Sequence, residues 1–435
     1  MKIQIPKGTF DILPYGCKET WRLSDLWQYA IAVIRRTAAE YGYREIQTPI
    51  YERTELFSRG VGETSDIVSK EMFTFLDRAE RSISLRPEGT ASVVRAFVEN
   101  NLASLGPTHK FFYIGPMFRY ERPQSGRYRQ HHQFGAEAFG VASPEQDVEL
   151  IDLMLQIYQR LGLKHLKVHV NTVGDPASRA TYREVLLNYL KPHFAELSAD
   201  SQARFEKNPL RILDSKDPQD KKIVEHAPSI LNHLTPEAKE HFQTLCHLLD
   251  QSQIPYVIDD KMVRGLDYYN KTVFEVLTEN LGAQNTLGGG GRYDGLISQF
   301  DGPNTPSIGF ATGLERVLQV MIAQNVHYPS TLRPFVYFIP LGDEAREKCF
   351  AFTSSCRHYH IPADIELSLK KVPAAIQNAL RLEAKYVCII GSDELKKGSA
   401  MFKELATRQE KEIFLDKLIP TLKEIYAPRD LLPIV

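Results

Sequence analysis

With 435 residues, the chain is long enough for two or three domains, each with a hydrophobic core of its own. Hydrophobic residues make up 43% and charged residues 25%, which are globular values, and a net charge of −1 excludes a histone-like binder but not local basic patches. Five cysteines without a C-x-x-C pair predict reduced thiols. No apolar leader and no run of membrane length stands in the sequence, so we expect a cytoplasmic protein with no membrane partner.

The N-terminal region predicts a loop, a helix and a short strand. Residues 1–16 are broken by prolines and a glycine, and apolar residues at helical spacing predict a helix over residues 23–38, with Gly42 as its stop. Residues 45–48 predict a short strand that Pro49 ends. Alone this pattern is weak, since many α/β proteins place an amphipathic helix before a strand.

Residues 82–100, SISLRPEGTASVVRAFVEN, predict a strand that ends at Arg86 and a helix that begins near Thr90. Glu88 and Thr90 lie at this junction, where the free amide groups of a helix end face outward. Glu88 is then either a helix cap or a ligand-binding carboxylate, and the sequence alone leaves both open.

A basic hairpin follows. Residues 110–120 predict one strand, a turn lies at residues 123–126, and a second strand begins near Arg127. Five Lys or Arg residues stand against one acid between residues 110 and 132, which favours an anionic ligand over a merely solvated hairpin.

In its second strand, alternation places four residues on one face. These are His131, Gln133, Gly135 and Glu137. A glutamine and a glutamate flank a glycine that would let a ligand approach closely.

The middle of the chain changes character. A helix over residues 145–161 and a strand over residues 166–170 precede a polar, helical stretch, residues 175–250, which we interpret as an inserted helical domain. It contains no catalytic constellation, and we interpret His241 and His247 as lone surface histidines rather than metal ligands.

Three further segments carry distinctive patterns. Residues 263–276, VRGLDYYNKTVFEV, follow a short strand at residues 256–259 and place two tyrosines side by side. The glycine-rich segment at residues 287–295, LGGGGRYDG, is not a phosphate-binding Walker loop, but its glycines allow close approach to a ligand. Residues 306–321, PSIGFATGLERVLQVM, predict a strand, a glycine turn and a helix that carries Arg316.

After a linker at residues 325–333, strands and helices alternate to the C-terminus, which predicts a small sheet with covering helices.

In combination these segments resemble the class II aminoacyl-tRNA synthetases. The hairpin FRYERPQSGRYRQHHQFGAE resembles motif 2 in its histidyl-tRNA synthetase version, residues 23–49 resemble motif 1, residues 306–321 resemble motif 3, and RGLDYY resembles a segment peculiar to histidyl-tRNA synthetases and their paralogues. The resemblance implies an α+β fold with an antiparallel catalytic sheet over residues 1–331. It also implies a helical insert at residues 175–250 and an α/β anticodon-binding domain at residues 332–435.

The resemblance also implies roles for individual residues. Arg119 and Arg264 would act at the α-phosphate of ATP, while His131 and Arg316 would hold its adenine, and Arg316 also the γ-phosphate. The histidine site would comprise Glu88, Gly89, Thr90, Gln133, Glu137, Tyr268 and Tyr269. The tRNA acceptor end would meet Arg122, Gln124 and Arg127. No metal-ligating residue is expected.

His131 departs from the family, in which phenylalanine is usual at this place. A neutral imidazole can stack on adenine, whereas a protonated one would add a cation near Arg316, so we expect low pH to weaken ATP binding. A shifted backbone that leaves His131 at the pocket edge is the alternative.

The implied activity is that of a histidine–tRNA ligase, with L-histidine, ATP, Mg²⁺ and tRNA(His) as partners and a homodimer as the assembly. The alternative is a non-catalytic paralogue that regulates ATP phosphoribosyltransferase in histidine biosynthesis. Such paralogues lose catalytic residues and the anticodon domain, whereas this chain keeps Arg119, Arg264, Arg316 and a C-terminal domain.

Overall fold

A computed structural model describes residues 3–62, 65, 67–121, 126–279, 285–329, 333–368 and 371–426. The chain divides into two compact units, Met1–His327 and Tyr328–Val435. Within the described ranges, no helix is both long and apolar enough to cross a membrane.

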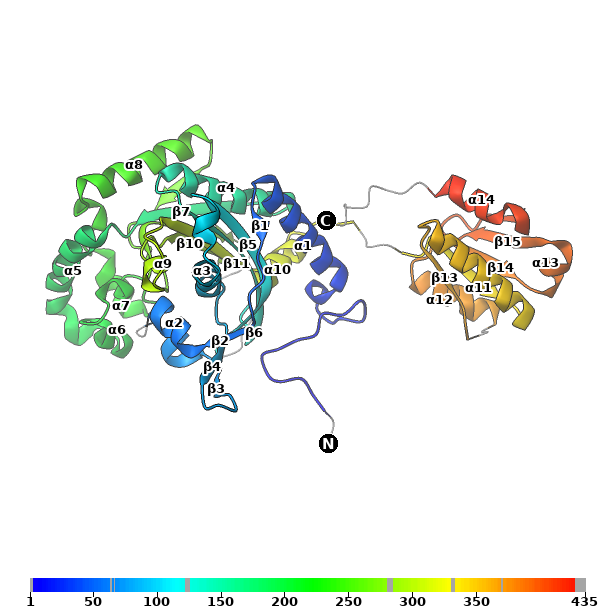
Figure 1. The fold of residues 1–435 in the computed structure, drawn as a ribbon, viewed down its shortest axis with the longest axis horizontal. Coiled ribbons are helices and arrows are strands. Elements are labelled where there is room, and N and C mark those ends of the chain that lie inside the picture. The colour runs from blue at the N-terminus through cyan, green and yellow to red at the C-terminus, as the bar shows by residue number, and fades with distance from the viewer. Residues whose placement is uncertain are drawn as a thin grey trace. The chain divides into compact units, whose positions relative to one another are not determined.

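The first unit is built on an eight-stranded sheet in the order β1-β5-β6-β11-β10-β9-β7-β8 (Figure 1). The edge pairs β1–β5 and β7–β8 are parallel and the pairs between them are antiparallel, which confirms the predicted antiparallel core. The strands are β1 (Arg44–Glu45), β5 (His109–Phe118), β6 (Gln130–Phe139), β7 (Leu166–Thr172), β8 (Tyr256–Ile258), β9 (Asn270–Thr278), β10 (Thr286–Arg292) and β11 (Ser307–Gly313).

Four helices cover one face of this sheet. They are α1 (Ser24–Glu40), α4 (Pro144–Arg160), α8 (Pro236–Gln251) and α10 (Leu314–Ala323), which contact one another and strands β6, β9 and β11. On β6 the side chains of Phe134 and Ala136 are buried on this side, while Gln133 and Glu137 alternate to the opposite face.

The opposite face carries α3 (Thr90–Glu99), α9 (Leu296–Gln299) and the inserted helices other than α8. Val93 and Ile297, from α3 and α9, pack in one apolar cluster with Tyr113 of the sheet and with Leu186 of the insert. A short sheet, β2 (Tyr51–Arg53), β4 (Ser82–Leu85) and β3 (Thr74–Leu76), and the helix α2 (Thr54–Val61) complete this side (Figure 1).

The polar stretch after β7 forms helices because several of its residues are of types that favour the start of a helix. Asp175, Ser198, Asp217 and Thr235 each accept a backbone N–H at a helix start, and proline follows three of them. The helices are α5 (Pro176–Leu190), α6 (Ala199–Arg204), α7 (Pro218–Glu225) and α8, with short 3₁₀ turns at Lys191–Glu196, Pro209–Ile212 and Ile230–Asn232.

The second unit has a five-stranded sheet in the order β13-β12-β14-β15-β16. Its parallel strands are β12 (Val336–Pro340), β13 (Ala363–Ile365) and β14 (Tyr386–Ile390), and its helices are α11 (Asp343–His358), α12 (Val372–Arg381), α13 (Ser392–Lys397) and α14 (Leu415–Ile425). We did not predict the antiparallel hairpin of β15 (Ser399–Glu404) and β16 (Glu410–Phe414). Its lysines and glutamates obscure the alternation of an edge strand, since β16 buries a single side chain, Ile413.

Candidate active site

The basic hairpin forms the centre of the site. Strands β5 and β6 pair in antiparallel register, with Gln133 opposite Gly115 and Glu137 opposite Phe111. Strand β6 begins at Gln130, three residues later than predicted from Arg127. Arg127 lies at the turn, where its Nη1 is 2.9 Å from Oε2 of Glu121.

The predicted tRNA-contacting residues Arg122 and Gln124 lie outside the described residues.

Glu137 is the most enclosed carboxylate of the site, with no exposed surface. The Thr90 hydroxyl donates to its Oε1 at 2.7 Å, the Tyr113 hydroxyl donates to the same oxygen at 3.4 Å, and the Tyr293 hydroxyl donates to Oε2. Burial raises the pKa of Glu137 to about 8, although the hydrogen bonds from Tyr293 and Thr90 oppose the shift. The carboxyl group therefore changes charge near neutral pH.

Close packing around Glu137 depends on glycines. A side chain at Gly135 or Gly89 would overlap the ring of Tyr113, and a side chain at Gly309 would overlap the Glu137 carboxylate. We predicted that Gly135 gives access to a ligand; instead, the group that approaches it is Tyr113 of the neighbouring strand. Gly89, predicted in the histidine site, makes room for the same ring.

Glu88 caps α3, one of the two roles left open by the sequence. Its carboxylate accepts the backbone N–H of Thr90 at 2.7 Å and of Ala91 at 2.9 Å, and the side chain is buried. Burial raises the pKa of Glu88, and the two N–H bonds oppose this. Because Thr90 bonds to both carboxylates, the start of helix α3 brings the two predicted acidic groups close together.

Gln133 and Arg119 lie on the same hairpin. The Oε1 atom of Gln133 is buried and has no hydrogen-bond partner within the described part of the chain. Arg119 follows β5, and its Nε donates to the carbonyl oxygen of Pro87 at 2.9 Å, just before Glu88. An unsatisfied buried amide oxygen is costly in a folded protein, which indicates a ligand donor at this place.

The tyrosine-containing segment joins β8 to β9, further along the sheet, and reaches the same region on the same face. Tyr268 packs against Tyr269 with ring centroids 4.7 Å apart and against Tyr293 at 5.4 Å. Arg264 donates to Glu275 of β9, and Thr286 donates to the other oxygen of Glu275 at 3.0 Å. The predicted histidine-site tyrosines are thus in contact with the partner of Glu137.

His131 and Arg316 lie beside Arg119. Burial lowers the pKa of His131 well below 6.5, and the nearby charges of Arg119 and Arg316 add to this effect. Arg316 donates to the carbonyl oxygens of Gly126 at 3.2 Å and Thr286 at 2.8 Å, and burial, followed by repulsion from Arg127, lowers its pKa. The electrostatics therefore match a neutral imidazole among arginines.

The glycine-rich segment is the central strand β10 rather than a loop. A side chain at Gly290 would overlap the backbone of β11, and one at Gly288 would approach the Tyr158 hydroxyl to 2.7 Å, so these glycines allow packing between elements. A side chain at Gly289 would meet the carbonyl oxygen of Phe274 at 2.5 Å and Nη1 of Arg264 at 2.9 Å, so this strand lies beside Arg264.

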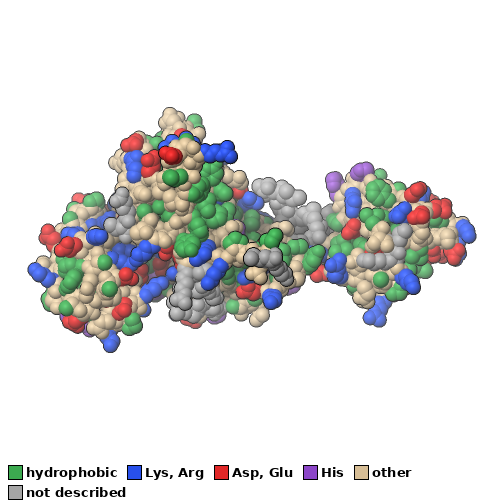
Figure 2. All heavy atoms as spheres, turned by 90° about the horizontal axis from the view of Figure 1, so that it is seen from below, with side chains coloured by type: hydrophobic (Ala, Val, Ile, Leu, Met, Phe, Trp, Pro, Cys, Tyr) green, Lys and Arg blue, Asp and Glu red, His purple; other side chains and the backbone are tan. Residues whose placement is uncertain are grey.

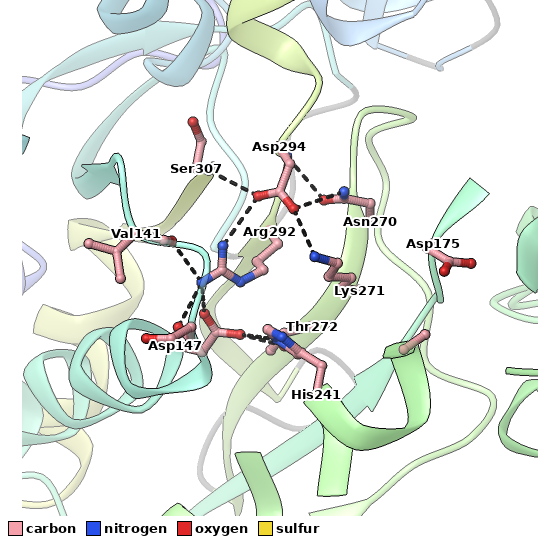
Figure 3. Close-up of polar contacts among 12 residues, drawn as sticks. Val141, Asp147, Asp175, His241, Asn270, Lys271, Thr272, Arg292, Asp294 and Ser307 are labelled. Atoms are coloured by element: carbon pink, nitrogen blue, oxygen red, sulfur yellow. Dashed lines mark hydrogen bonds and ion pairs between the residues drawn. The ribbon is translucent and has the colours of Figure 1, made fainter. Parts of the chain in front are cut away.

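A buried ion-pair network anchors the end of β10 (Figure 3). Arg292 has no exposed surface and lies 2.7 Å from Asp147 of α4 and 3.2 Å from Asp294. Asp147 also accepts from Thr272 at 2.6 Å and lies 3.0 Å from the ring of His241. Because Tyr293 follows Arg292 directly, this network fixes the tyrosine that bonds to Glu137.

This network corrects one prediction. The His241 side chain is 9% exposed and bonded to Asp147 and Thr272, so it is not the surface histidine that we expected. The polar sequence around it concealed the buried stripe of α8, which includes Phe242, Leu245 and Leu249.

The sequence patterns did not single out Tyr113, Tyr293 and Glu275. Strand alternation could have placed Tyr113 on the site face, since it pairs with Gly135 two residues from Glu137. Glu275 pairs with Gly289 across β9 and β10, and that register was not available from the sequence. No group of three acidic, histidine or cysteine side chains suited to a metal ion occurs in the described ranges.

Comparison with known proteins gives one consistent family. The family model described as histidyl-tRNA synthetase matches residues 18–317, and the model of an anticodon binding domain matches residues 336–425. Curated histidine–tRNA ligases of Protochlamydia amoebophila and Desulforamulus reducens are 55% and 46% identical, covering 97% and 96% of this chain and 100% and 98% of their own. The apo histidyl-tRNA synthetase structure of S. aureus is 36% identical with a TM-score of 0.82, covering 97% of this chain and all of that chain.

Proposed function

The chain belongs to the histidyl-tRNA synthetase family, and from that premise we infer that it is a histidine–tRNA ligase. It activates L-histidine with ATP and transfers the histidyl group to tRNA. The observation that carries this conclusion is the 55% identity to a curated histidine–tRNA ligase over the full length of that relative.

The reaction needs no protein nucleophile. The histidine carboxylate attacks the α-phosphorus of ATP, forming a mixed anhydride and releasing pyrophosphate; the terminal ribose hydroxyl of the tRNA then attacks the carbonyl carbon and AMP leaves. We assign Arg119 and Arg264 to the α-phosphate, where they offset the negative charge that develops during the first step. Arg316 and His131 would hold the adenine. The site would provide the remaining rate acceleration by holding the reacting groups in the correct orientation.

Several contacts support the assigned histidine site. The Oε1 atom of Gln133, which has no hydrogen-bond partner among the described residues, suits the histidine ammonium group, and the Glu88 carboxylate lies two residues from Thr90 on the same helix start. Glu137 suits the imidazole, with Tyr268 and Tyr269 as the aromatic wall. Three hydroxyl groups donate to the Glu137 carboxylate, which has about four acceptor sites, so one site is left for a ring N–H of the ligand, and a side chain without that N–H would leave it unpaired.

Mg²⁺ fits as part of the nucleotide substrate. Magnesium commonly keeps water ligands and binds phosphate oxygens with one or two carboxylates, so it needs no cage of protein ligands. We therefore propose that the ion enters the site as MgATP.

For tRNA, we assign the acceptor end to the hairpin turn with Arg122, Gln124 and Arg127, and the anticodon to the C-terminal unit. The family model for anticodon binding supports the second assignment. Figure 2 shows Lys and Arg side chains mixed with Asp and Glu over the face that it draws, rather than gathered in one basic patch.

We also propose a cytoplasmic homodimer. Large apolar side chains are exposed around β2 and β3, among them Tyr51 at 56% and Leu76 at 66%, and exposed apolar patches commonly mark association surfaces. Sedimentation of the purified protein tests the assembly, and a monomer at micromolar concentration would contradict it.

The comparisons favour the ligase over the regulatory alternative. The curated ligases match this chain through both of its units, and the chain keeps Arg119, Arg264 and Arg316, which we assign to ATP.

One experiment separates the possibilities. The purified protein should exchange labelled pyrophosphate into ATP only when histidine is present, and should then charge tRNA(His). Exchange that is absent, or that another amino acid supports equally well, would contradict the proposed function.

A further inference from the structure

The segment of residues 261–269, here called the 261–269 loop, carries three of the assigned site residues but lies in no helix or strand. It joins β8 to β9 and contains Arg264, Tyr268 and Tyr269. A loop without ladder hydrogen bonds needs other partners for its backbone and polar groups if its side chains are to hold one geometry. The part of the chain that supplies those partners also determines the geometry of the proposed histidine pocket.

The inserted domain supplies partners at both ends of the loop and within it. Arg179 of α5 donates from Nη1 to the carbonyl oxygen of Tyr269 at 3.0 Å. Asn208, between α6 and the next 3₁₀ turn, donates from Nδ2 to Oδ1 of Asp267 at 2.8 Å. At the start of the loop, Lys261 donates to the carbonyl oxygen of Ala227, after α7, at 2.6 Å.

The sheet and helix α2 contribute further polar contacts to the loop. Asn171 of β7 donates to the carbonyl oxygen of Met262 at 2.9 Å, and the N–H of Asp267 donates to the carbonyl oxygen of Val61, in α2, at 3.4 Å. Beyond these, Arg264 pairs with Glu275 of β9.

Apolar contacts also join the 261–269 loop to the insert. One buried cluster contains Leu186 and Ile212 of the insert, Met262 and Tyr269 of the loop, and Tyr293, which bonds to Glu137. The core of the insert is therefore continuous with the aromatic wall of the proposed histidine pocket, and a change in one is transmitted by direct packing to the other.

We propose that Arg179 and Asn208 are positioning residues for histidine binding, which act by holding the 261–269 loop against the insert. This inference rests on the roles proposed above for Tyr268 and Tyr269. Asn208 holds the carboxylate of Asp267, which directly precedes the two tyrosines. Arg179 holds the carbonyl group of Tyr269, the second of them. A pocket held in advance binds its ligand without the loss of loop entropy on binding.

The test compares Asn208→Ala with a matched variant, Gln202→Ala. Gln202 donates to the carbonyl oxygen of Leu197 at 2.9 Å, and both residues belong to the insert. Gln202→Ala therefore removes a hydrogen bond like that of Asn208 but leaves the loop contacts unchanged. In histidine-dependent pyrophosphate exchange, Asn208→Ala should raise the KM for histidine about five- to tenfold and leave the KM for ATP within about twofold. Gln202→Ala should change neither.

The same comparison applies on α5. Arg179→Ala should raise the KM for histidine, whereas Arg183→Ala should not, because Arg183 bonds to Glu206 inside the insert. Thermal unfolding of each pair checks that the positioning and control variants lose similar stability.

A second substitution keeps the test decisive if the alanine variants fold poorly. Asn208→Asp preserves size but places a carboxylate against Asp267, so the loop should be repelled and the KM for histidine should rise more than in Asn208→Ala. In an Asp267→Ala background, Asn208→Ala should add no further effect, because its partner is already gone.

The results that would contradict the positioning role differ from those that would contradict the proposed function. If wild-type protein shows no histidine-dependent exchange, the proposed function fails. If wild type is active and both Asn208 variants keep the wild-type KM for histidine, the positioning role is overturned. Equal rises in the variants and in Gln202→Ala would also overturn it, since a general loss of insert stability would then explain the change.

Discussion

At the scale of single residues, Glu137 combines full burial with a raised pKa, and its energetic cost should be measurable. Below a pH of about 4.3, the group is protonated in both folded and unfolded chains. Between there and its folded-state pKa of about 8, the folded chain keeps a proton that the unfolded chain releases. Stability must therefore fall as pH rises through this window.

Glu137→Gln removes that titration. The variant should match wild type in stability near pH 4.5 and become more stable than wild type toward pH 8, with the difference growing by at most ~1.4 kcal/mol per pH unit. The same variant should lose discrimination against histidine analogues. Thermal unfolding from pH 4.5 to 8 checks the first part, and a constant difference across that range would contradict the raised pKa.

The His131 ring brings a second residue-scale prediction, and here the structure changes our expectation. We expected low pH to weaken ATP binding through protonation of this ring, but burial and the neighbouring arginines lower its pKa well below 6.5. The ring should stay neutral over most of the range from pH 5.5 to 8. The KM for ATP should then follow parallel pH curves in wild type and His131→Phe.

A phenylalanine offers more apolar area to adenine, so His131→Phe should lower the KM for ATP by about two- to threefold at every pH, if the ring stacks on the base. An acid-side rise confined to wild type would show that His131 titrates in this range after all, and an unchanged KM would place it at the pocket edge.

At the scale of elements, the sequence predicted what depends on local patterns. Apolar periodicity located α1 and α4, and the junction at Arg86 and Thr90 marked the end of β4 and the start of α3. Resemblance of the ordered motifs located the predicted site residues within one catalytic unit. These features depend on neighbours in the sequence, or on whole strings specific to one family.

What the sequence could not give is the pairing between distant segments. The Tyr113 ring over Gly135, the hydroxyl of Tyr293 on Glu137, and the Arg292–Asp147 pair each join residues from different elements. The glycines at 288–291 predicted that another group lies close to this segment, but not which group. The sheet order shows that strands β9 and β11 lie on either side of it.

Gly135→Ala tests this packing between β5 and β6. A methyl group there overlaps the Tyr113 ring, which would have to rotate away from Glu137 and from Gly89. We expect a loss of about 1–3 kcal/mol of stability and a rise in the KM for histidine. Gly313→Ala, on the adjacent strand and open to a methyl group, is the control. Equal behaviour of the two variants in unfolding and exchange assays would contradict the packing role.

At the scale of the whole molecule, the two units have separate cores, and the assigned site residues all lie in the first. The apolar cluster of Phe338, Cys388 and Leu418 belongs to the second unit alone, while Glu137, Arg264 and Arg316 lie before its first residue, Tyr328. Adenylate chemistry and anticodon contact should therefore be separable by truncation.

Deletion of residues 328–435 should leave histidine-dependent pyrophosphate exchange within about tenfold of wild type, because no proposed catalytic group is removed. Charging of tRNA should fall at least ~100-fold, since the loss of a tethered second contact lowers the effective concentration of tRNA at the site. Exchange and charging are measured on the same preparation, with sedimentation to compare its assembly with that of the full chain. A truncated protein that charges tRNA normally would refute the anticodon role, whereas loss of exchange in a folded truncation would show that the site depends on the second unit.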